Sequence, residues 1–424
     1  MSVVLADAFL TTDWQQPAMV AAAGLALGRP AAWLDRVAEA VLLTYPFAPA
    51  DRPRELARFV AGITRVPGGQ ALRVRRAVVH RRLVSPAHAV HMRWGVPEIG
   101  DLGALADFLG LDGDALDWFA DRREINRLGR DERLRHYRYT WLPHRLIEAP
   151  KPRLRALQRR LLAEVLARMP VHERAHGFVP GRGVYSFAAG HAGQAVLVSL
   201  DLRAFFSTIT AARIYGLFRG AGYPEPVAHA LTALTTTRTP AYVLRAAPDS
   251  FRAALLRRPH LPQGAPTSPA LANLCAFRLD RRLTGLADRV GVHYSRYADD
   301  LAFSGELGGR QPGALIAAVG RIVADEGFRL HPEKIRVRGQ ADRQRLAGLV
   351  VNAGPAAPRE DYDRLRAILH NAATHGLAAA NRDGHPDFEA YLTGRVAWVA
   401  HRHPARAAKL QGLLRAAIAA GTAH

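Results

Sequence analysis

The chain has 424 residues, of which 49% are hydrophobic, so it can bury a large core and form two or three domains. The formal net charge of +21 favours a polyanionic partner, either nucleic acid or an anionic membrane surface, although a GC-rich genome can account for part of the arginine excess. The single cysteine, Cys275, excludes an internal disulfide and a cysteine zinc site.

Signals for export or membrane insertion are missing. No Lys or Arg precedes Arg29, so the apolar run at residues 17–28 lacks the positively charged region of a signal peptide. We find no segment of about 20 apolar residues that could cross a bilayer. We therefore expect a cytoplasmic protein whose partner is nucleic acid and not a membrane.

The first 95 residues are rich in alanine and predict a series of helices. Gly and Pro predict breaks in this series at residues 28–30 and again at residues 66–69. Nothing in this region resembles a set of catalytic side chains.

Two short helices are predicted next. Leu102, Leu105 and Leu109 recur at helical spacing, and Gly110 ends that helix. Residues 114–119 predict the second helix. Their apolar faces favour a small packing unit over a DNA-reading pair of helices.

Residues 121–160 are strongly basic, and the aromatic residues Tyr137, Tyr139 and Trp141 lie among the charges. Charges that contact phosphates and rings that stack on bases are typical of a groove for single-stranded nucleic acid. The alternative is a solvated basic helix face, and composition leaves both interpretations open.

The middle of the chain predicts a small sheet. Residues 195–200 form a β-rich run that ends in Asp201, and residues 292–304 predict two strands that fold back around Asp299 and Asp300. Helical stretches lie between and after these strands, so the pattern indicates an α+β fold. Beyond Pro358 the chain is helical again, with one apolar face made by Tyr362, Leu365, Ile368, Leu369 and Ala372.

The acidic residues at the strand ends carry the chemistry. Asp201 closes an apolar strand, and Asp299 and Asp300 are neighbours in a tight turn. Such charges cost free energy unless a cation neutralises them. Two Mg²⁺ ions, roughly 3.5–4 Å apart, perform nucleotidyl transfer between carboxylates of this kind, and Mn²⁺ could substitute. Because turns favour Asp in any case, the pair alone is not specific.

Three segments together resemble the reverse transcriptase family, in its bacterial retron-type branch. They are Leu-Asp-Leu-Arg-Ala-Phe-Phe-Ser at 200–207, Leu-Pro-Gln-Gly-Ala-Pro-Thr-Ser-Pro at 261–269 and Tyr-Ala-Asp-Asp at 297–300. The resemblance covers roughly residues 130–352. It implies an RNA-directed DNA polymerase that binds an RNA template, deoxynucleotides (dNTPs) and its DNA product. It also implies that Asp201, Asp299 and Asp300 are the catalytic, metal-binding residues.

The resemblance implies further contacts with the nucleotide. The ring of Phe206 would clash with a 2′-hydroxyl and act as a steric gate, whereas Phe205 is expected in the core. Gly264 would let the backbone approach the nucleotide closely. The nucleotide-binding residues implied are Arg145, Phe206, Gln263, Gly264 and Lys334.

Nucleic-acid contacts are implied for Lys151, Arg182, Tyr297 and Gly348. Two motifs depart from the retron-type pattern. Residues 187–191 read Phe-Ala-Ala-Gly-His where the family has Asn-Ala-x-x-His, and residues 346–348 read Leu-Ala-Gly where it has Val-Thr-Gly. Both departures leave open whether the chain serves a retron RNA or belongs to a related bacterial lineage.

We therefore expect a right-hand polymerase of α+β class. A helical N-terminal extension would span residues 1–125, a fingers and palm core residues 126–352, and a helical thumb residues 353–424. The template would be a structured cognate noncoding RNA, and a role in anti-phage defence follows by analogy alone. The alternatives are an RNA-dependent RNA polymerase, which Phe206 disfavours, an inactive RNA-binding scaffold, which the intact Asp residues disfavour, and untemplated DNA synthesis.

Overall fold

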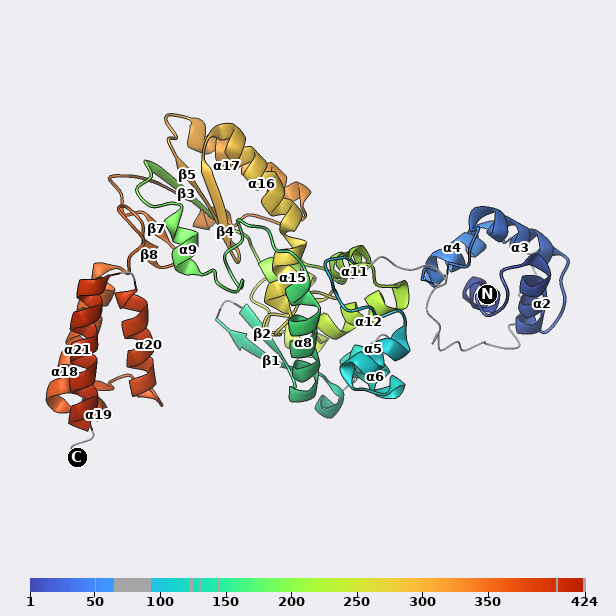
Figure 1. Cartoon of the computed structure of the whole chain (residues 1–424), viewed down its shortest axis with the longest axis horizontal. Helices are drawn as coiled ribbons and strands as arrows, with labels where there is room; N and C mark the ends of the chain where they lie inside the picture. Colours follow the sequence, from blue (N-terminus) through green and yellow to red (C-terminus); the bar gives the residue numbers. More distant parts are fainter. Residues whose placement is uncertain are drawn as a thin grey trace. The chain divides into compact units, whose positions relative to one another are not determined.

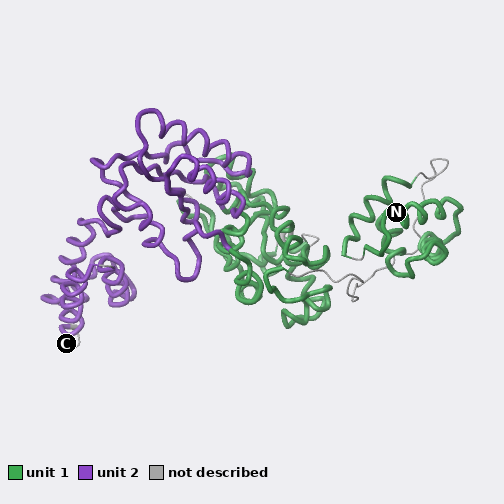
Figure 2. Tube along the Cα trace, turned by 45° about the horizontal axis from the view of Figure 1, so that its top comes forward, with its two compact units in different colours: residues 1–170, 206–275 green, residues 171–205, 276–424 purple. Residues whose placement is uncertain are grey.

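The computed structural model describes residues 1–49, 51–64, 93–121, 125–129, 131–143, 145–401 and 403–421. These residues combine many helices with small antiparallel sheets, which agrees with the predicted α+β class (Figure 1). They divide into two compact units (Figure 2): unit 1 comprises residues 1–170 and 206–275, and unit 2 comprises residues 171–205 and 276–424. The boundaries drawn from the sequence at residues 125 and 352 describe polymerase subdomains and stay a prediction.

Unit 1 begins with a four-helix cluster, as the alanine-rich sequence predicted. Its core includes the fully buried Leu5, Phe9 and Leu34. Gly28, with φ of 71°, ends the second helix, so the predicted break at residues 28–30 is confirmed, while the break at residues 66–69 lies outside the described residues. The helices are α1 (Ser2–Phe9), α2 (Gln16–Leu27), α3 (Trp33–Thr44) and α4 (Pro53–Ile63).

The next two helices, α5 (Leu102–Leu109) and α6 (Gly113–Ala120), confirm the predicted pair. Asp101 and Asp112 accept hydrogen bonds from first-turn amides and thereby cap the two helices. Gly110 ends α5 in the left-handed conformation. Both helices contact α12 (Glu225–Thr235), so this pair serves packing.

The basic segment contains a β-hairpin that neither interpretation of its composition foresaw. Strands β1 (Tyr137–Leu142) and β2 (Arg145–Pro150) pair antiparallel. Tyr137 is buried, and the Trp141 indole donates a hydrogen bond to the Val243 carbonyl. The segment is therefore not one basic helix face, and these two rings stabilise the hairpin.

Further helices complete unit 1 and its link to the sheet. They are α7 (Ile125–Leu128), α8 (Pro152–Glu164), α10 (Phe205–Thr208), α11 (Ala211–Gly220), α13 (Ala241–Leu244), α14 (Ser250–Leu256) and α15 (Ser268–Cys275).

Unit 2 is built on a four-stranded antiparallel sheet of order β4-β5-β3-β6. Both faces of its central strand are buried, as Leu197 and Val198 show, because helices cover the sheet. Helices α9 (Val184–Ala189) and α16 (Phe277–Val290) contact β4, and α17 (Gln311–Asp325) contacts α16. The strands are β3 (Val196–Asp201), β4 (His293–Tyr297), β5 (Asp300–Gly305) and β6 (Arg336–Gly339), which confirms the three strands predicted.

The C-terminal part of unit 2 is helical after a two-stranded hairpin. The predicted apolar face is confirmed, since Leu365, Leu369 and Ala372 are buried against α20 and α21. No helix in the described part of the chain is long and apolar enough to cross a membrane. The elements are β7 (Arg345–Leu346), β8 (Leu349–Val350), α18 (Arg359–His375), α19 (Leu377–Ala380), α20 (Phe388–Ala400) and α21 (Pro404–Gly421).

Candidate active site

Three carboxylates meet at one end of the unit 2 sheet. Asp201, the last residue of β3, lies directly opposite Asp300, the first residue of β5, in the antiparallel ladder. Asp299 precedes Asp300 in the turn after β4, where Ala298 takes a left-handed φ of 55°. The Asp299 carbonyl accepts a hydrogen bond from the amide of Leu202 at 2.9 Å, which fastens this turn to the end of β3.

Burial and mutual repulsion both disfavour the charged forms of these carboxylates. Burial raises the pKa of Asp300 to about 7, and the neighbouring Asp299 and Asp201 add to the effect. The Lys334 ammonium donates a hydrogen bond to Asp201 Oδ2 at 2.9 Å, and this bond raises the pKa of Lys334. The end of the sheet is thus rich in negative charge and favours a cation.

The donor set fits a divalent cation that binds together with a phosphate ligand. Among the described residues, no group of three His, Cys, Asp or Glu side chains lies close enough to hold an ion alone. Mg²⁺, however, is usually bound through one or two carboxylates, with substrate phosphates and water completing its coordination. The facing Asp201 and Asp300 supply such a pair.

A cavity of about 260 Å³ adjoins these carboxylates and has a basic rim. Asp201, Asp300 and Lys334 line it, and so do three arginines that the sequence analysis did not single out: Arg336, Arg338 and Arg345. Arg336 and Arg338 stand two residues apart on β6, so they share one face of the strand. That alternation was visible in the sequence, and guanidinium groups suit phosphate oxygens.

A buried ion pair holds the acidic turn in place. Arg296 is fully buried and binds both carboxylate oxygens of Asp280 on α16, at 2.8 and 2.7 Å. The same guanidinium donates to the Ala298 carbonyl at 3.0 Å. Gly177 covers the turn, since a Cβ there would lie 2.6 Å from the Ala298 amide nitrogen. The position of Asp299 therefore depends on residues distant in sequence.

His191, part of one departing motif, has a structural role. It is fully buried, and its two ring nitrogens lie 2.7 Å from the hydroxyls of Ser304 on β5 and Ser295 on β4. Burial lowers its pKa to about 3, helped by the nearby His293 and His176. The neutral ring therefore joins the two strands that carry the turn.

This burial predicts sensitivity to acid. The pKa of His191 is about 3 in the folded chain and near 6.5 when unfolded, so its contribution to stability is complete above pH 6.5 and is lost as pH falls. We expect it to cost about 2 kcal/mol of unfolding free energy at pH 5 relative to pH 7. Urea unfolding at both pH values should show a smaller acid effect in His191→Gln. The exposed His370→Gln should behave as wild type, and equal acid effects in all three proteins would contradict the assignment.

The remaining nucleotide candidates lie in unit 1. Arg145 begins β2, is exposed and has no ion pair within the described residues. Gln263 and Gly264 form a loop beside β2, where the Gln263 carbonyl accepts a hydrogen bond from the Glu148 amide at 2.8 Å. Gly264 has φ of 128°, and a Cβ there would lie 3.2 Å from the Glu148 carbonyl oxygen, so this close approach requires glycine.

A buried polar brace under this loop was not predicted. The Glu148 carboxylate accepts a hydrogen bond from the Thr239 hydroxyl and lies 2.7 Å from Nε2 of His260, just before the loop. All three side chains are buried, so each must find its partner within the protein. The brace fixes Gln263 relative to β2, and only the fold brings its members together.

The other predicted site residues differ in burial and in their contacts with the rest of the protein. Phe205 is buried against Phe328, as expected, while Phe206 is partly exposed. One nitrogen of the Arg182 guanidinium donates to three backbone carbonyls. Lys151 donates to the Glu132 carbonyl. Tyr297 contacts other rings, and the exposed Gly348, with φ of 86°, forms the turn between β7 and β8. Their roles in binding stay predictions.

The chain is similar in sequence to known reverse transcriptases. The family described as "Reverse transcriptase (RNA-dependent DNA polymerase)" matches residues 143–350. The Retron Mx65 reverse transcriptase of Myxococcus xanthus is 40% identical over 335 residues, which cover 77% of this chain and 74% of the relative. The Retron Mx162 reverse transcriptase of the same organism is 41% identical over 65% of this chain and 60% of its own. The Retron Ec86 reverse transcriptase of Escherichia coli is 29% identical over 54% of this chain and 65% of the relative.

Proposed function

Because the chain belongs to the retron-type reverse transcriptases and is an RNA-directed DNA polymerase, we propose that it copies a structured cognate noncoding RNA into DNA by two-metal nucleotidyl transfer. Reverse transcriptases generally use divalent metal ions, and Mg²⁺ is the ion we propose here. The observation that carries the proposal is the direct pairing of Asp201 with Asp300 beside the Asp299 turn.

The proposed reaction joins a primer hydroxyl to a deoxynucleotide. The oxygen bonds to the α-phosphorus, the bond to pyrophosphate breaks, and the hydroxyl proton is released. Bound Mg²⁺ would activate the hydroxyl and neutralise the leaving group. Asp201, Asp299 and Asp300 supply the anionic oxygens, and Lys334 balances the charge of phosphate oxygens or donates a proton to the leaving pyrophosphate. By the resemblance to the retron-type family, priming would start from a 2′-hydroxyl of the cognate RNA.

The subdomain assignment belongs to the same proposal. Unit 2 contributes the palm sheet with the carboxylates, β2 and the Gln263 loop contribute to the fingers, and α18, α20 and α21 form the thumb. The net charge of +21 supports contact with a polyanionic template–primer duplex. A role in anti-phage defence rests on analogy with the family.

Primer extension with product sequencing tests the proposal. With Mg²⁺ and an RNA template of known sequence, the protein should convert deoxynucleotides into complementary DNA. DNA unrelated to the template would establish untemplated synthesis, and RNA made from ribonucleotides would establish an RNA polymerase. The cognate RNA should copurify from cells that carry the gene and its flanking DNA, and sequencing it would identify the template.

Phe206 is expected to select the sugar. Phe206→Ala should lower the preference for deoxynucleotides over ribonucleotides by roughly 10- to 100-fold, because no ring would then oppose the 2′-hydroxyl. The measurement is kcat/KM for each nucleotide on the same template. Phe206→Tyr keeps the ring and should keep the preference. An unchanged preference in Phe206→Ala would remove Phe206 from the nucleotide site.

A further inference from the structure

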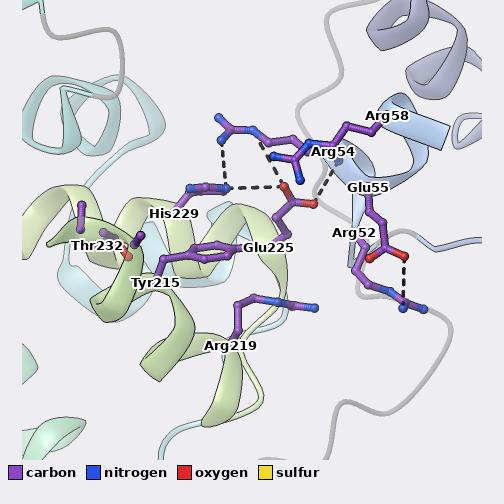
Figure 3. A pocket seen from close by; sticks show the side chains of 11 residues that line it. Arg52, Arg54, Glu55, Arg58, Tyr215, Arg219, Glu225, His229 and Thr232 are labelled. Atoms are coloured by element: carbon purple, nitrogen blue, oxygen red, sulfur yellow. Dashed lines mark hydrogen bonds and ion pairs between the residues drawn. The ribbon is translucent and has the colours of Figure 1, made fainter. Parts of the chain in front are cut away.

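Unit 1 contains a second basic cavity that the proposed reaction does not use. It has a volume of about 380 Å³ and lies where α4 and α12 begin, beside α11 (Figure 3). We call it the arginine pocket, after four of the residues that line it: Arg52, Arg54, Arg58 and Arg219. The N-terminal ends of two helices add partial positive charge to that of the guanidinium groups.

One of these guanidinium groups has no acidic partner in the described part of the chain. Arg219 lies 3.3 Å from Asp51, Arg52 lies 3.7 Å from Glu55, and Arg54 lies 3.9 Å from Glu225. Arg58 is exposed and has no ion pair or hydrogen bond with any residue that the structure describes. Two glutamates therefore face four arginines in the lining, and Arg58 is the cation left for a ligand.

Glu225 cannot serve as the missing partner of Arg58. Its carboxylate is buried, accepts a hydrogen bond from the Arg54 amide at 3.0 Å and lies 3.5 Å from His229 Nε2. Burial alone would raise its pKa, but the bonds from His229 and the Arg54 amide lower it overall. Glu225 thus acts as an internal cap for α4, and its charge is already compensated.

An aromatic pair lies on the same lining. The ring of Tyr215 on α11 stacks on His229, with centroids 4.2 Å apart and planes inclined by 23°. In Figure 3 the His229 ring lies level with the Glu225 carboxylate, and the Tyr215 ring lies below both. Guanidinium groups for phosphate and rings for bases are the combination found in sites for single-stranded nucleic acid.

We propose that the arginine pocket binds a phosphate of a single-stranded RNA segment through Arg58, with an adjacent base on the Tyr215–His229 pair. The inference rests on the proposed RNA template, yet it concerns binding alone. A failure of nucleotidyl transfer would appear in primer extension and would leave the binding test intact. A free nucleotide offers the same chemistry, so the test includes one.

Substitution of Arg58 separates binding from folding, since Arg58 has no ion pair or hydrogen bond to lose among the residues that the structure describes. We expect Arg58→Ala to bind a labelled single-stranded RNA of about 20 nucleotides roughly tenfold more weakly in the full-length chain. The slope of log affinity against log salt concentration should fall by about 0.7, the value for one phosphate contact on a single strand. Arg36→Ala is the matched control, because Arg36 is exposed on α3 and has no partner within the described residues.

Cross-linking locates the contact. RNA that contains 4-thiouridine should cross-link to the α11 peptide with Tyr215 in wild type and in Arg36→Ala, and at RNA concentrations below the Kd the cross-link should fall roughly tenfold in Arg58→Ala. Millimolar AMP should not compete. Equal RNA affinity in the two variants, or a missing α11 cross-link in wild type, would overturn the proposal. Loss of the cross-link with AMP would overturn the choice of RNA in favour of a free nucleotide.

Discussion

Asp299→Asn should abolish DNA synthesis on an RNA template, with a loss of more than about 10³-fold in kcat, equivalent to roughly 4 kcal/mol of activation free energy. The substitution keeps the size of the side chain but removes its charge. Asp299 stands at the turn beside the Asp201–Asp300 pair and is only partly buried, so we expect the substitution to leave the fold intact. Single-turnover primer extension with saturating Mg²⁺ measures the effect on chemistry.

A matched control distinguishes charge at the site from charge in general. Asp288 is exposed on α16 in the same unit, so Asp288→Asn should retain full activity. RNA binding should survive in both variants, because the carboxylates repel a polyanion and do not hold it. If Asp299→Asn stayed within tenfold of wild type, the metal-binding role of Asp299 would be wrong.

The sequence predicted the parts of this site that depend on local pattern. An apolar run closed by Asp201 predicted β3, and a tight turn between two short strands predicted the β4–β5 hairpin. Once both were antiparallel neighbours, the pairing of Asp201 with Asp300 followed from the register of the ladder. The end of α5 at Gly110 was predicted for the same reason, since a glycine cap is a local signal.

The β1–β2 hairpin was missed because its composition suggested a different role. Tyr137, Tyr139 and Trp141 stand at every second position, which is a strand signal. Their basic neighbours suggested either stacking groups in a nucleic-acid groove or a solvated helix face, and neither interpretation is a hairpin. Charged residues can alternate with rings on a strand, since the exposed face of an antiparallel sheet tolerates them.

Contacts between residues far apart in the chain could not be predicted from the sequence. Glu148 contacts His260 and Thr239 across 112 and 91 residues, and Glu225 accepts a hydrogen bond from the Arg54 amide across 171 residues. Neither fact has a local signature. They became visible only when distant segments were placed beside each other in the fold.

Gly177→Ala tests whether such a contact controls the chemistry. Gly177 has no proposed contact with substrate, yet an added Cβ would lie 2.6 Å from the Ala298 nitrogen and 3.3 Å from the Tyr297 carbonyl carbon. The backbone of the acidic turn must then move away from residue 177. This movement strains the hydrogen bond from Arg296 to the Ala298 carbonyl, because the buried pair with Asp280 fixes the Arg296 guanidinium. A displacement of roughly 1 Å at catalytic groups can cost about 100-fold in rate, and we expect a loss in kcat of that size.

Measurements of stability and RNA affinity beside kcat distinguish a displaced acidic turn from an unfolded protein. Gly285 on α16 has no atom within 4 Å of an added Cβ, so Gly285→Ala should be fully active. Gly177→Ala should unfold in urea at a concentration close to that of wild type and bind RNA with similar affinity, while its primer extension slows. A variant that kept wild-type kcat would show that the turn accommodates a methyl group, and the position of Asp299 would then not depend on Gly177. A variant that lost folding and activity together would make Gly177 a determinant of stability, and Ser or larger residues there would be worse in proportion to their size.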